Sequence, residues 1–362
     1  MNRQPCALVM AGGTGGHIFP GLAVAEALRA RGWRVHWLGV PGSMEERLVP
    51  PRGFAFEPVE FGGVRGKGLA TLLRLPLRLA RALAQARAVL RRVQPDVVLG
   101  LGGYITVPGG LAARLAGKPI VLHEQNSIAG LSNRWLGRLA EQSFSAYPNA
   151  LVGAEWVGNP LRAEFLAQPA PAERFAGRSG PLRVLVVGGS LGAQALNNVV
   201  PRALALIPAR SRPQVTHQSG EKQIAALRAA YQDAGVLAEL TPFIEDTARA
   251  FADADLVIAR AGASTVTELA AVGAATVFVP FPHAVDDHQT HNARFLVDAG
   301  AAWLLPQTEL SPERLAALLQ GLDREQLRAR ADLARAQRKA GAVEAMVQAC
   351  ERLQEPNQTT RT

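Results

Sequence analysis

The chain has 362 residues, of which 48% are apolar and 19% charged, and it carries a formal net charge of +9 at pH 7. This composition excludes a disordered chain, and the length predicts about two domains rather than a single core. Its two cysteines, Cys6 and Cys350, offer no disulfide framework and no cysteine-based zinc site, and we find no signal-like segment or long apolar run, so we expect a cytoplasmic protein without a membrane-spanning helix.

Short apolar runs alternate with helical stretches along the whole chain. Eight of these runs are typical of strands buried on both faces of a parallel sheet. They are residues 6–11, 34–39, 97–102, 119–124, 183–189, 213–220, 255–260 and 275–281. The alternation predicts an α/β protein with doubly wound open sheets and right-handed crossovers.

Two glycine-rich turns join an apolar strand to an apolar helix, one within residues 8–28 and one within 184–204. The first does not fit a dinucleotide fingerprint, because Ile18 stands where the last glycine belongs, and the chain has no Gly-Lys-Ser/Thr of a Walker A loop. A helix N-terminus favours an anion, and Thr14 and Ser190 add hydroxyl donors. Because many such turns are purely structural, each is a moderate indication of phosphate binding.

Positive charge is concentrated between Glu60 and Asp96, where eight lysines and arginines occur without an acidic residue. Leucines and arginines at spacings of three and four predict a basic amphipathic helix, with Pro76 near its start or at a break. Such a face suits an anionic lipid surface, and an ordinary surface helix with solvated arginines explains it equally well. Nucleic acid is disfavoured as a partner, because aromatic and basic residues are not interleaved.

Three later stretches follow strands at the same sheet edge: Gly102-Gly103-Tyr104, residues 123–126 and residues 262–268. Because open α/β sheets bind ligands beyond the carboxyl ends of their strands, we expect these stretches to line a crevice between the domains. Three residues can cap the helix of the last stretch: Ser264, Thr265 and Thr267. Glu268 is then either an acidic residue favoured by the helix dipole or a group turned toward ribose hydroxyls at a second phosphate site.

The domain boundary is expected near residue 160. Residues 155–181 are rich in proline, glycine and alanine, and the strand pattern restarts directly after them. We therefore expect domains at 1–160 and 161–340. The chain is helical again from about residue 325, and its last helix, at about 340–362, can pack back on either domain, including the N-terminal one.

The most polar cluster is FPHAVDDHQTHNA, at residues 281–293. His288 and His291 stand three residues apart, which would permit a metal site, but neither HExxH nor a cysteine partner is present. Clustered Asp, His, Gln and Asn side chains equally suit the hydroxyls of a sugar. We favour carbohydrate recognition over a metal.

Motifs from residue 8 to about 300 occur in a consistent order and spacing: MAGGTGGHIFPGLAVA, LGLGGYITVPGG, LHEQNSIAGLSN, VGNPLR, VVGGSLGAQALN, HQSGEK and RAGASTVTELAAVGAATVFVPFPHAVDDHQTHNA. Together they resemble the MurG family of bacterial glycosyltransferases, within glycosyltransferase family 28. The resemblance implies a GT-B fold, in which two Rossmann-like domains face a cleft, with no cofactor and no obligatory metal. It also implies UDP-GlcNAc as donor, undecaprenyl-linked lipid I as acceptor, lipid II as product, and inversion at the anomeric carbon.

The same resemblance assigns the donor contacts to residues of both domains: Thr14, Gly15, Gly16, Asn126, Arg162, Ser190, Ile244, Ala263, Ser264, Thr265, Val266, Thr267, Glu268 and Gln289. It implies that the C-terminal domain holds the nucleotide and that the first turn lies at the acceptor's diphosphate. Ile244 would meet uracil, Glu268 the ribose, Ser190 the diphosphate and Gln289 the GlcNAc. Two local departures concern this site: Leu191 replaces the family's usual glutamine, and an inserted residue near 287 makes Gln289 a weaker assignment.

His17 is the candidate catalytic base, because an imidazole with its ordinary pKa of about 6.5 can accept a proton at neutral pH. The alternative is that His17 only caps or orients the loop.

Since the implied acceptor is anchored in lipid, the resemblance also favours docking of the basic helix on the cytoplasmic face of the inner membrane. The docking residues would be Arg74, Leu75, Arg78, Leu79 and Arg81. The alternative is that the chain is a UDP-GlcNAc 2-epimerase, a GT-B enzyme of another class that needs no lipid-docking face.

Overall fold

The computed structural model describes residues 3–62, 74–189 and 192–354 and divides the chain into two compact units. The first unit contains residues 1–162 together with 339–362, and the second contains residues 163–338. Each unit has its own sheet and its own core, and each is described by itself below.

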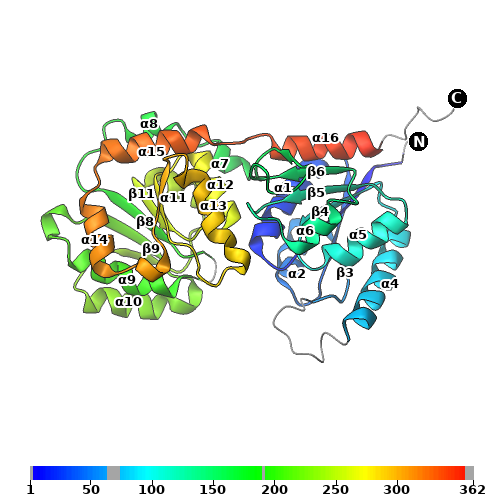
Figure 1. Ribbon diagram of the computed structural model, residues 1–362, viewed down its shortest axis with the longest axis horizontal. Helices are drawn as coiled ribbons and strands as arrows, with labels where there is room; N and C mark the ends of the chain where they lie inside the picture. The colour runs from blue at the N-terminus through cyan, green and yellow to red at the C-terminus, as the bar shows by residue number, and fades with distance from the viewer. Residues whose placement is uncertain (1–2, 63–73, 190–191, 355–362) are drawn as a thin grey trace. The chain divides into compact units, whose positions relative to one another are not determined.

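In the described part of the first unit, seven strands form a parallel sheet in the order β3-β2-β1-β4-β5-β6-β7 (Figure 1). The strands are β1 (Cys6–Ala11), β2 (Arg34–Gly39), β3 (Ala55–Pro58), β4 (Val97–Gly102), β5 (Ile120–Glu124), β6 (Gln142–Ser145) and β7 (Glu155–Trp156). The chain order reverses direction across the sheet between β1 and β4, which is the doubly wound arrangement expected from the sequence.

Helices cover both faces of this sheet, which explains why β1 is apolar throughout. Ala7, Val9 and Ala11 belong to one core cluster, and Cys6, Leu8 and Met10 belong to another. The helices of the unit are α1 (Gly15–Ala30), α2 (Met44–Leu48), η1 (Pro50–Arg52), α4 (Leu75–Val93), α5 (Thr106–Leu115), α6 (Leu131–Leu136) and α16 (Ala342–Gln354). Helices α1 and α16 contribute to the first cluster, and α4 and α5 to the second (Figure 1).

The C-terminal helix α16 therefore belongs to the N-terminal unit. Its side chains Met346, Val347 and Cys350 are fully buried in the cluster that also contains α1. Arg31, at the end of α1, forms ion pairs with Glu344 at 2.6 Å and Glu351 at 2.9 Å. The sequence left open on which domain this helix packs, and the structure shows that it packs on the N-terminal unit.

In the described part of the second unit, six strands form a parallel sheet in the order β10-β9-β8-β11-β12-β13. The strands are β8 (Arg183–Val187), β9 (Gln214–Gln218), β10 (Glu239–Thr241), β11 (Leu256–Ala259), β12 (Thr276–Phe278) and β13 (Ala302–Leu304). The α-helices are α7 (Ala163–Leu166), α8 (Pro171–Phe175), α9 (Gln194–Ala205), α10 (Ile224–Asp233), α11 (Thr247–Asp253), α12 (Ala263–Val272), α13 (His288–Val297), α14 (Pro312–Gln320) and α15 (Arg324–Ala336). Short 3₁₀ helices are η2 (Ala209–Ser211), η3 (Glu221–Gln223), η4 (Val285–Asp287) and η5 (Gln307–Glu309).

All eight strands expected from the sequence are present. The first three have the expected ends, and each of the other five is shorter than expected by one to four residues. The short strands β3, β6, β7, β10 and β13 were not expected. Four of them, β3, β7, β10 and β13, are brief edge strands, and the interior strand β6 has only four residues, of which three are polar. Residues 155–181, expected to lack sheet structure, contain β7 and two short helices. Pro76 lies in the first turn of α4, where proline is tolerated, rather than at a break.

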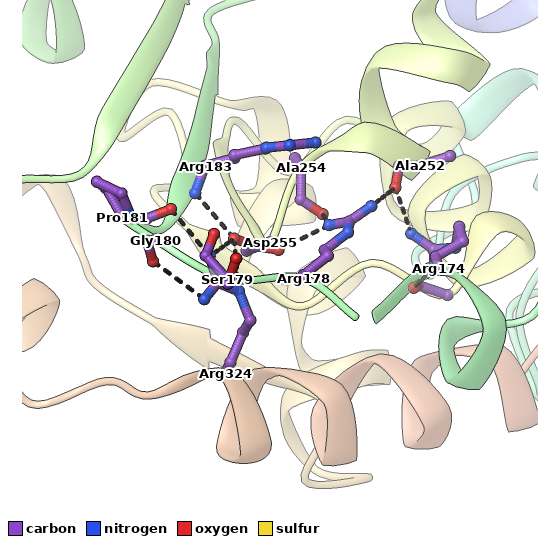
Figure 2. Close-up of polar contacts among 11 residues, drawn as sticks. Arg174, Arg178, Ser179, Gly180, Pro181, Arg183, Ala252, Ala254, Asp255 and Arg324 are labelled. Carbon is purple, nitrogen blue, oxygen red and sulfur yellow. Dashed lines mark hydrogen bonds and ion pairs between the residues drawn. The ribbon is translucent and has the colours of Figure 1, made fainter. Parts of the chain in front are cut away.

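Asp255, immediately before β11, holds together the start of the second unit's sheet (Figure 2). Its side chain is fully buried, and it accepts hydrogen bonds from Arg178 at 2.6 Å and from the Arg183 N–H at 2.9 Å. Arg324, in the first turn of α15, reaches the same carboxylate at 3.2 Å. One acidic side chain thus ties the segment before β8 to a helix that follows about 140 residues later in the sequence.

Candidate functional site

The first glycine-rich turn lies at the carboxyl end of β1 and leads into α1. Thr14 is the N-cap residue of α1, and its hydroxyl does not cap the helix. Its carbonyl instead accepts from the N–H groups of His17 at 3.1 Å and Ile18 at 3.2 Å. The N–H groups of Gly15 and Gly16 belong to the first turn, which has no intrahelical acceptors to offer them. This end of α1 therefore presents N–H donors and a hydroxyl to an anion.

Glu45 on α2 supports this turn, and sequence reasoning missed it. Its side chain is 1% exposed, and it accepts from the N–H of Gly13 at 3.2 Å and from the N–H of Val40 at 3.2 Å. In the sequence, Glu45 looks like an ordinary acidic residue in the first turn of a short helix, so nothing marks it as part of the site. Only the folded chain brings it beneath the turn.

His17 lies beside the turn that follows β4, the neighbour of β1 in the sheet. A Cβ atom on Gly102 would lie 2.8 Å from the His17 ring, and Gly102 has a φ of +104°. Any larger residue at Gly102 would therefore displace the imidazole and also strain the backbone. Gly102 makes room for His17, and Gly103 makes room for the backbone carbonyl of Gly12, while a ligand contact at this turn stays a prediction.

His17 is connected to the end of β5 through side-chain hydrogen bonds. Its Nδ1 lies 2.7 Å from Oε1 of Gln125, and the Gln125 amide nitrogen lies 3.0 Å from Nδ1 of His123. His123 Nε2 in turn lies 2.8 Å from the carbonyl oxygen of Gly158. His123 is fully buried, and this burial lowers its pKa from 6.5 to about 4. His17 itself is half-buried and so remains accessible from one side.

Asn126 is oriented by the neighbouring buried carboxylate of Glu124. Glu124 accepts from the Asn126 N–H at 2.8 Å and from its side-chain nitrogen at 3.3 Å. The same carboxylate accepts from Gly130 N–H at 3.2 Å and from Asn133 at 2.9 Å. Residues 14–17 and residue 126 therefore follow β1 and β5, which lie on either side of β4 in the sheet. Arg162 is exposed at the last position of the unit's first segment.

In the second unit, Ser190 and Leu191 of the other glycine-rich turn lie outside the described residues. The flanking residue Gly192 has a φ of +75°, and a Cβ atom there would overlap the carbonyl oxygen of Ser219. Gln218 donates its side-chain N–H groups to the carbonyls of Gly189 and Pro242, both at 3.1 Å. Sequence reasoning missed Gln218, which connects the glycine-rich turn to the loop that carries Ile244.

Ile244 is half-buried in the loop between β10 and α11. It lines a cavity of about 750 Å³ together with residues of β8 and β9. Phe243, beside it, is 59% exposed, and its carbonyl accepts from the hydroxyl of Thr241 at 2.6 Å. The loop thus presents an apolar surface and backbone groups, which suits the face and edge of a planar base.

Helix α12 begins at Ala263, and none of the three candidate hydroxyl residues caps it. The N-cap is Gly262, while the Thr267 hydroxyl donates to the carbonyls of Ala263 and Ser264, both at 3.0 Å. The Ser264 hydroxyl is buried without a hydrogen-bond partner among the described residues. Val266 is fully buried, and Thr265 and Glu268 are half-buried. The open helix end and the unsatisfied Ser264 hydroxyl are what a bound anion would complete.

Gln289, in the first turn of α13, ties two loops of the second unit together. Its side-chain oxygen accepts from the N–H groups of Ala261 at 3.3 Å and Phe281 at 2.9 Å. It therefore has its amide nitrogen to offer to a sugar hydroxyl. Within residues 3–62, 74–189 and 192–354 no group of three His, Cys, Asp or Glu side chains could hold a metal ion.

The basic helix α4 buries one stripe and exposes another. Ala82, Ala86, Val89 and Leu90 are buried, and Leu75 and Leu79 pack against the same core cluster. Leu75 and Leu79 are half-buried and pack against this cluster with part of their surface, so their contact with lipid stays a prediction, and the exposed leucine is Leu77, at 75%. Arg74 and Arg81 are exposed and Arg78 is half-buried. No helix in the described part of the chain is long and apolar enough to cross a membrane.

Comparisons with known proteins agree with one another over almost the whole chain. The glycosyltransferase family 28 N-terminal domain matches residues 7–145, and the glycosyltransferase family 28 C-terminal domain matches residues 183–349. The UDP-N-acetylglucosamine–N-acetylmuramyl-(pentapeptide) pyrophosphoryl-undecaprenol N-acetylglucosamine transferase of Acidovorax sp. (strain JS42) is 69% identical over 351 residues, which cover 97% of this chain and 88% of that relative. The transferase of the same name from Paracidovorax citrulli (strain AAC00-1) is 68% identical over 353 residues, covering 98% and 99%.

Solved structures support the same assignment. The crystal structure of Acinetobacter baumannii MurG has a TM-score of 0.85 and 40% sequence identity, and the match covers 96% of this chain and 99% of that one. The calicheamicin glycosyltransferase CalG4, at 18% identity and a TM-score of 0.67, shares the fold alone. These matches confirm the expected GT-B fold class. The chain belongs to glycosyltransferase family 28 and, within it, to the MurG family.

Proposed function

We propose that this chain is an inverting glycosyltransferase that moves GlcNAc from UDP-GlcNAc to the C4 hydroxyl of the MurNAc sugar of lipid I, forming lipid II for peptidoglycan synthesis. The observation that carries this proposal is the 69% identity, over 97% of the chain, to a transferase whose name states that reaction. The polar groups at the carboxyl ends of both sheets are consistent with it, since they include helix N-termini for phosphates and hydrogen-bonding side chains for sugars.

In this proposal the second unit binds the donor. Ile244 meets the uracil, Glu268 the ribose hydroxyls, and the N-terminal turn of α12, from Ala263 to Thr267, a phosphate group. The Ser264 hydroxyl is buried without a hydrogen-bond partner among the described residues, which supports an anion at this point. Gln289 donates its amide nitrogen to the GlcNAc hydroxyls. Ser190, which is outside the described residues, remains the proposed diphosphate ligand of the second glycine-rich turn.

The first unit binds the acceptor and supplies the base. The turn of Thr14, Gly15 and Gly16 lies at the acceptor's diphosphate, and Asn126 and Arg162 contribute to binding of the donor. His17 accepts the proton of the attacking hydroxyl. The C4 oxygen forms a bond to C1 of GlcNAc while the bond from C1 to the UDP oxygen breaks, so the developing charge on UDP must be stabilised by N–H dipoles or positive charge. No metal or cofactor is part of the proposal.

We also propose that the protein is a peripheral enzyme of the cytoplasmic face of the inner membrane. The exposed face of α4 combines Arg74 and Arg81 with Leu77. Positive charge attracts anionic lipid headgroups, and one exposed leucine can insert at the interface. A lipid-linked acceptor would gain from this location because enzyme and acceptor then share one surface.

The proposed function is tested with labelled UDP-GlcNAc and a lipid I analogue. We expect a lipid-linked β1→4 disaccharide that forms only when the acceptor is present. The His17→Ala variant should reduce kcat by about 100- to 10,000-fold, which is the usual contribution of a general base, with little change in the KM of UDP-GlcNAc. Turnover within a few-fold of wild type would rule out His17 as the base. Acceptor-independent formation of UDP-ManNAc would instead identify a 2-epimerase.

A further inference from the structure

A continuous run of hydrogen bonds leads from a backbone carbonyl to the ring of His17. It joins Gly158, His123, Gln125 and His17, all within the first unit, with successive distances of 2.8, 3.0 and 2.7 Å. His123 and Gln125 are buried, at 0% and 1% exposure, so water does not compete for these contacts. Each hydrogen bond therefore constrains the next, and the position of every proton can be worked out from the Gly158 end.

The Gly158 carbonyl oxygen can only accept, so Nε2 of His123 must carry a proton. Burial lowers the pKa of His123 from 6.5 to about 4, and the ring is therefore neutral at physiological pH. A neutral imidazole has one N–H group. Nδ1 of His123 is consequently an acceptor, and it faces Gln125.

The Gln125 amide can have only one orientation in this environment. Its nitrogen lies 3.0 Å from Nδ1 of His123 and also 3.0 Å from the backbone carbonyl oxygen of His123. Both of these atoms are acceptors, so the NH₂ group must point toward them and Oε1 must point toward His17. An oxygen 2.7 Å from Nδ1 of His17 requires a proton on that nitrogen.

We propose that Gln125 is a positioning residue that holds neutral His17 in the tautomer with Nδ1 protonated and Nε2 unprotonated. This inference rests on the proposed role of His17 as the base, because it assigns Nε2 as the atom that receives the proton of the acceptor hydroxyl. A neutral amide suits this task better than a carboxylate. A carboxylate at the same position would also fix the tautomer, but its charge would favour protonated His17 and so reduce the fraction of free base.

The tautomer can be measured directly in the full-length wild-type protein. The chain has seven histidines, and the His17 ring signals can be assigned by their absence from a His17→Ala variant. In ¹⁵N-detected imidazole spectra recorded at a pH where the ring is neutral, we expect His17 Nδ1 to have the shift of a protonated nitrogen and Nε2 that of an unprotonated one. The opposite pattern would overturn the proposal without any kinetic measurement.

The Gln125→Met variant removes all three side-chain hydrogen bonds of Gln125 while keeping an unbranched side chain of similar length. We expect kcat to fall by roughly 10- to 100-fold, part of what a general base supplies, with the KM of UDP-GlcNAc within about twofold of wild type. The His17 signals should shift toward the Nε2–H tautomer that predominates in free histidine. The matched control is Gln348→Met, an exposed glutamine on α16 of the same unit, which should behave as wild type.

A second variant removes only one of the two acceptors that orient the Gln125 amide. In His123→Phe the backbone carbonyl of residue 123 still accepts from the Gln125 amide, so the His17 tautomer should persist and kcat should fall less than in Gln125→Met. Retention of both tautomer and kcat in Gln125→Met would overturn the positioning role. Normal turnover by His17→Ala would overturn the base role instead, and the tautomer spectra of the wild type and of Gln125→Met distinguish these two failures.

Discussion

Glu268 is the proposed ribose ligand, and its position on α12 supports this proposal. It lies in the second turn, half-buried, one turn beyond the buried Ser264 hydroxyl that has no partner among the described residues. Residues four apart lie on the same face of a helix, so Ser264 and Glu268 face the same region. A phosphate at the helix end and a ribose beside it would fit this spacing.

We therefore predict that Glu268→Ala raises the KM of UDP-GlcNAc by about tenfold or more, because a hydrogen bond to a charged group contributes about 1.5–3 kcal/mol. The KM of the lipid I analogue should change much less. A donor that lacks both ribose hydroxyls provides a second test. In the wild type its KM should be higher than that of UDP-GlcNAc, and in Glu268→Ala the two KM values should be similar. Equal increases in both KM values would contradict ribose binding.

At the scale of elements, the amphipathic pattern of α4 does not by itself determine which of its leucines are buried and which are exposed. The sequence places leucines and arginines on overlapping faces of the helix. In the structure, Leu75 and Leu79 pack partly against the core, and Leu77 is exposed. What remains for a membrane is mainly positive charge. Attraction by anionic lipid is worth about 1 kcal/mol for each basic residue near the surface.

Replacing Arg74, Arg78 and Arg81 by Glu should accordingly weaken binding to anionic vesicles by at least on the order of 100-fold at low salt. The effect should shrink as ionic strength rises, since screening shortens the range of the attraction. The matched control makes the same charge change at three exposed arginines of the second unit: Arg210, Arg249 and Arg328. Vesicle sedimentation gives the affinity, and unchanged binding of the α4 variant would exclude this helix as the docking face.

A second element-scale prediction concerns Asp255, which joins the start of β8 to α15 (Figure 2). Its loss would leave Arg178 and Arg324 beside a buried site without their carboxylate. Removing one partner of a buried ion pair costs about 3–5 kcal/mol. We expect Asp255→Ala to lower the free energy of unfolding of the second unit by about this amount, as measured in urea.

Asp332→Ala is the control for Asp255→Ala, because Asp332 pairs with Arg328 at 3.7 Å on an exposed helix face. Exposed pairs contribute at most about 1 kcal/mol, so this variant should unfold close to wild type. Similar destabilisation by both substitutions would show that the burial of Asp255 is not what matters.

At the scale of the whole molecule, the chain builds the same type of sheet twice and then returns to the first unit. Alternating apolar runs and helices predicted both sheets, because a strand covered on two faces must be apolar at every position. The return of α16 could not be predicted in the same way. Its apolar stripe, which includes Met346 and Val347, would fit any apolar surface, and only the structure shows that it completes the core beside α1.

The sequence by itself determined the α/β class, the two glycine-rich turns and the family, since these depend on local periodicity and on motifs of consecutive residues. The tertiary structure decided which side chains meet. His17 and Gln125 are 108 residues apart, and they make contact only because β1, β4 and β5 are neighbours in the sheet. Glu45 beneath the first turn and Gln218 behind the second were missed for the same reason. Strand order sets such contacts, and strand order depends on how the whole chain packs rather than on any one segment.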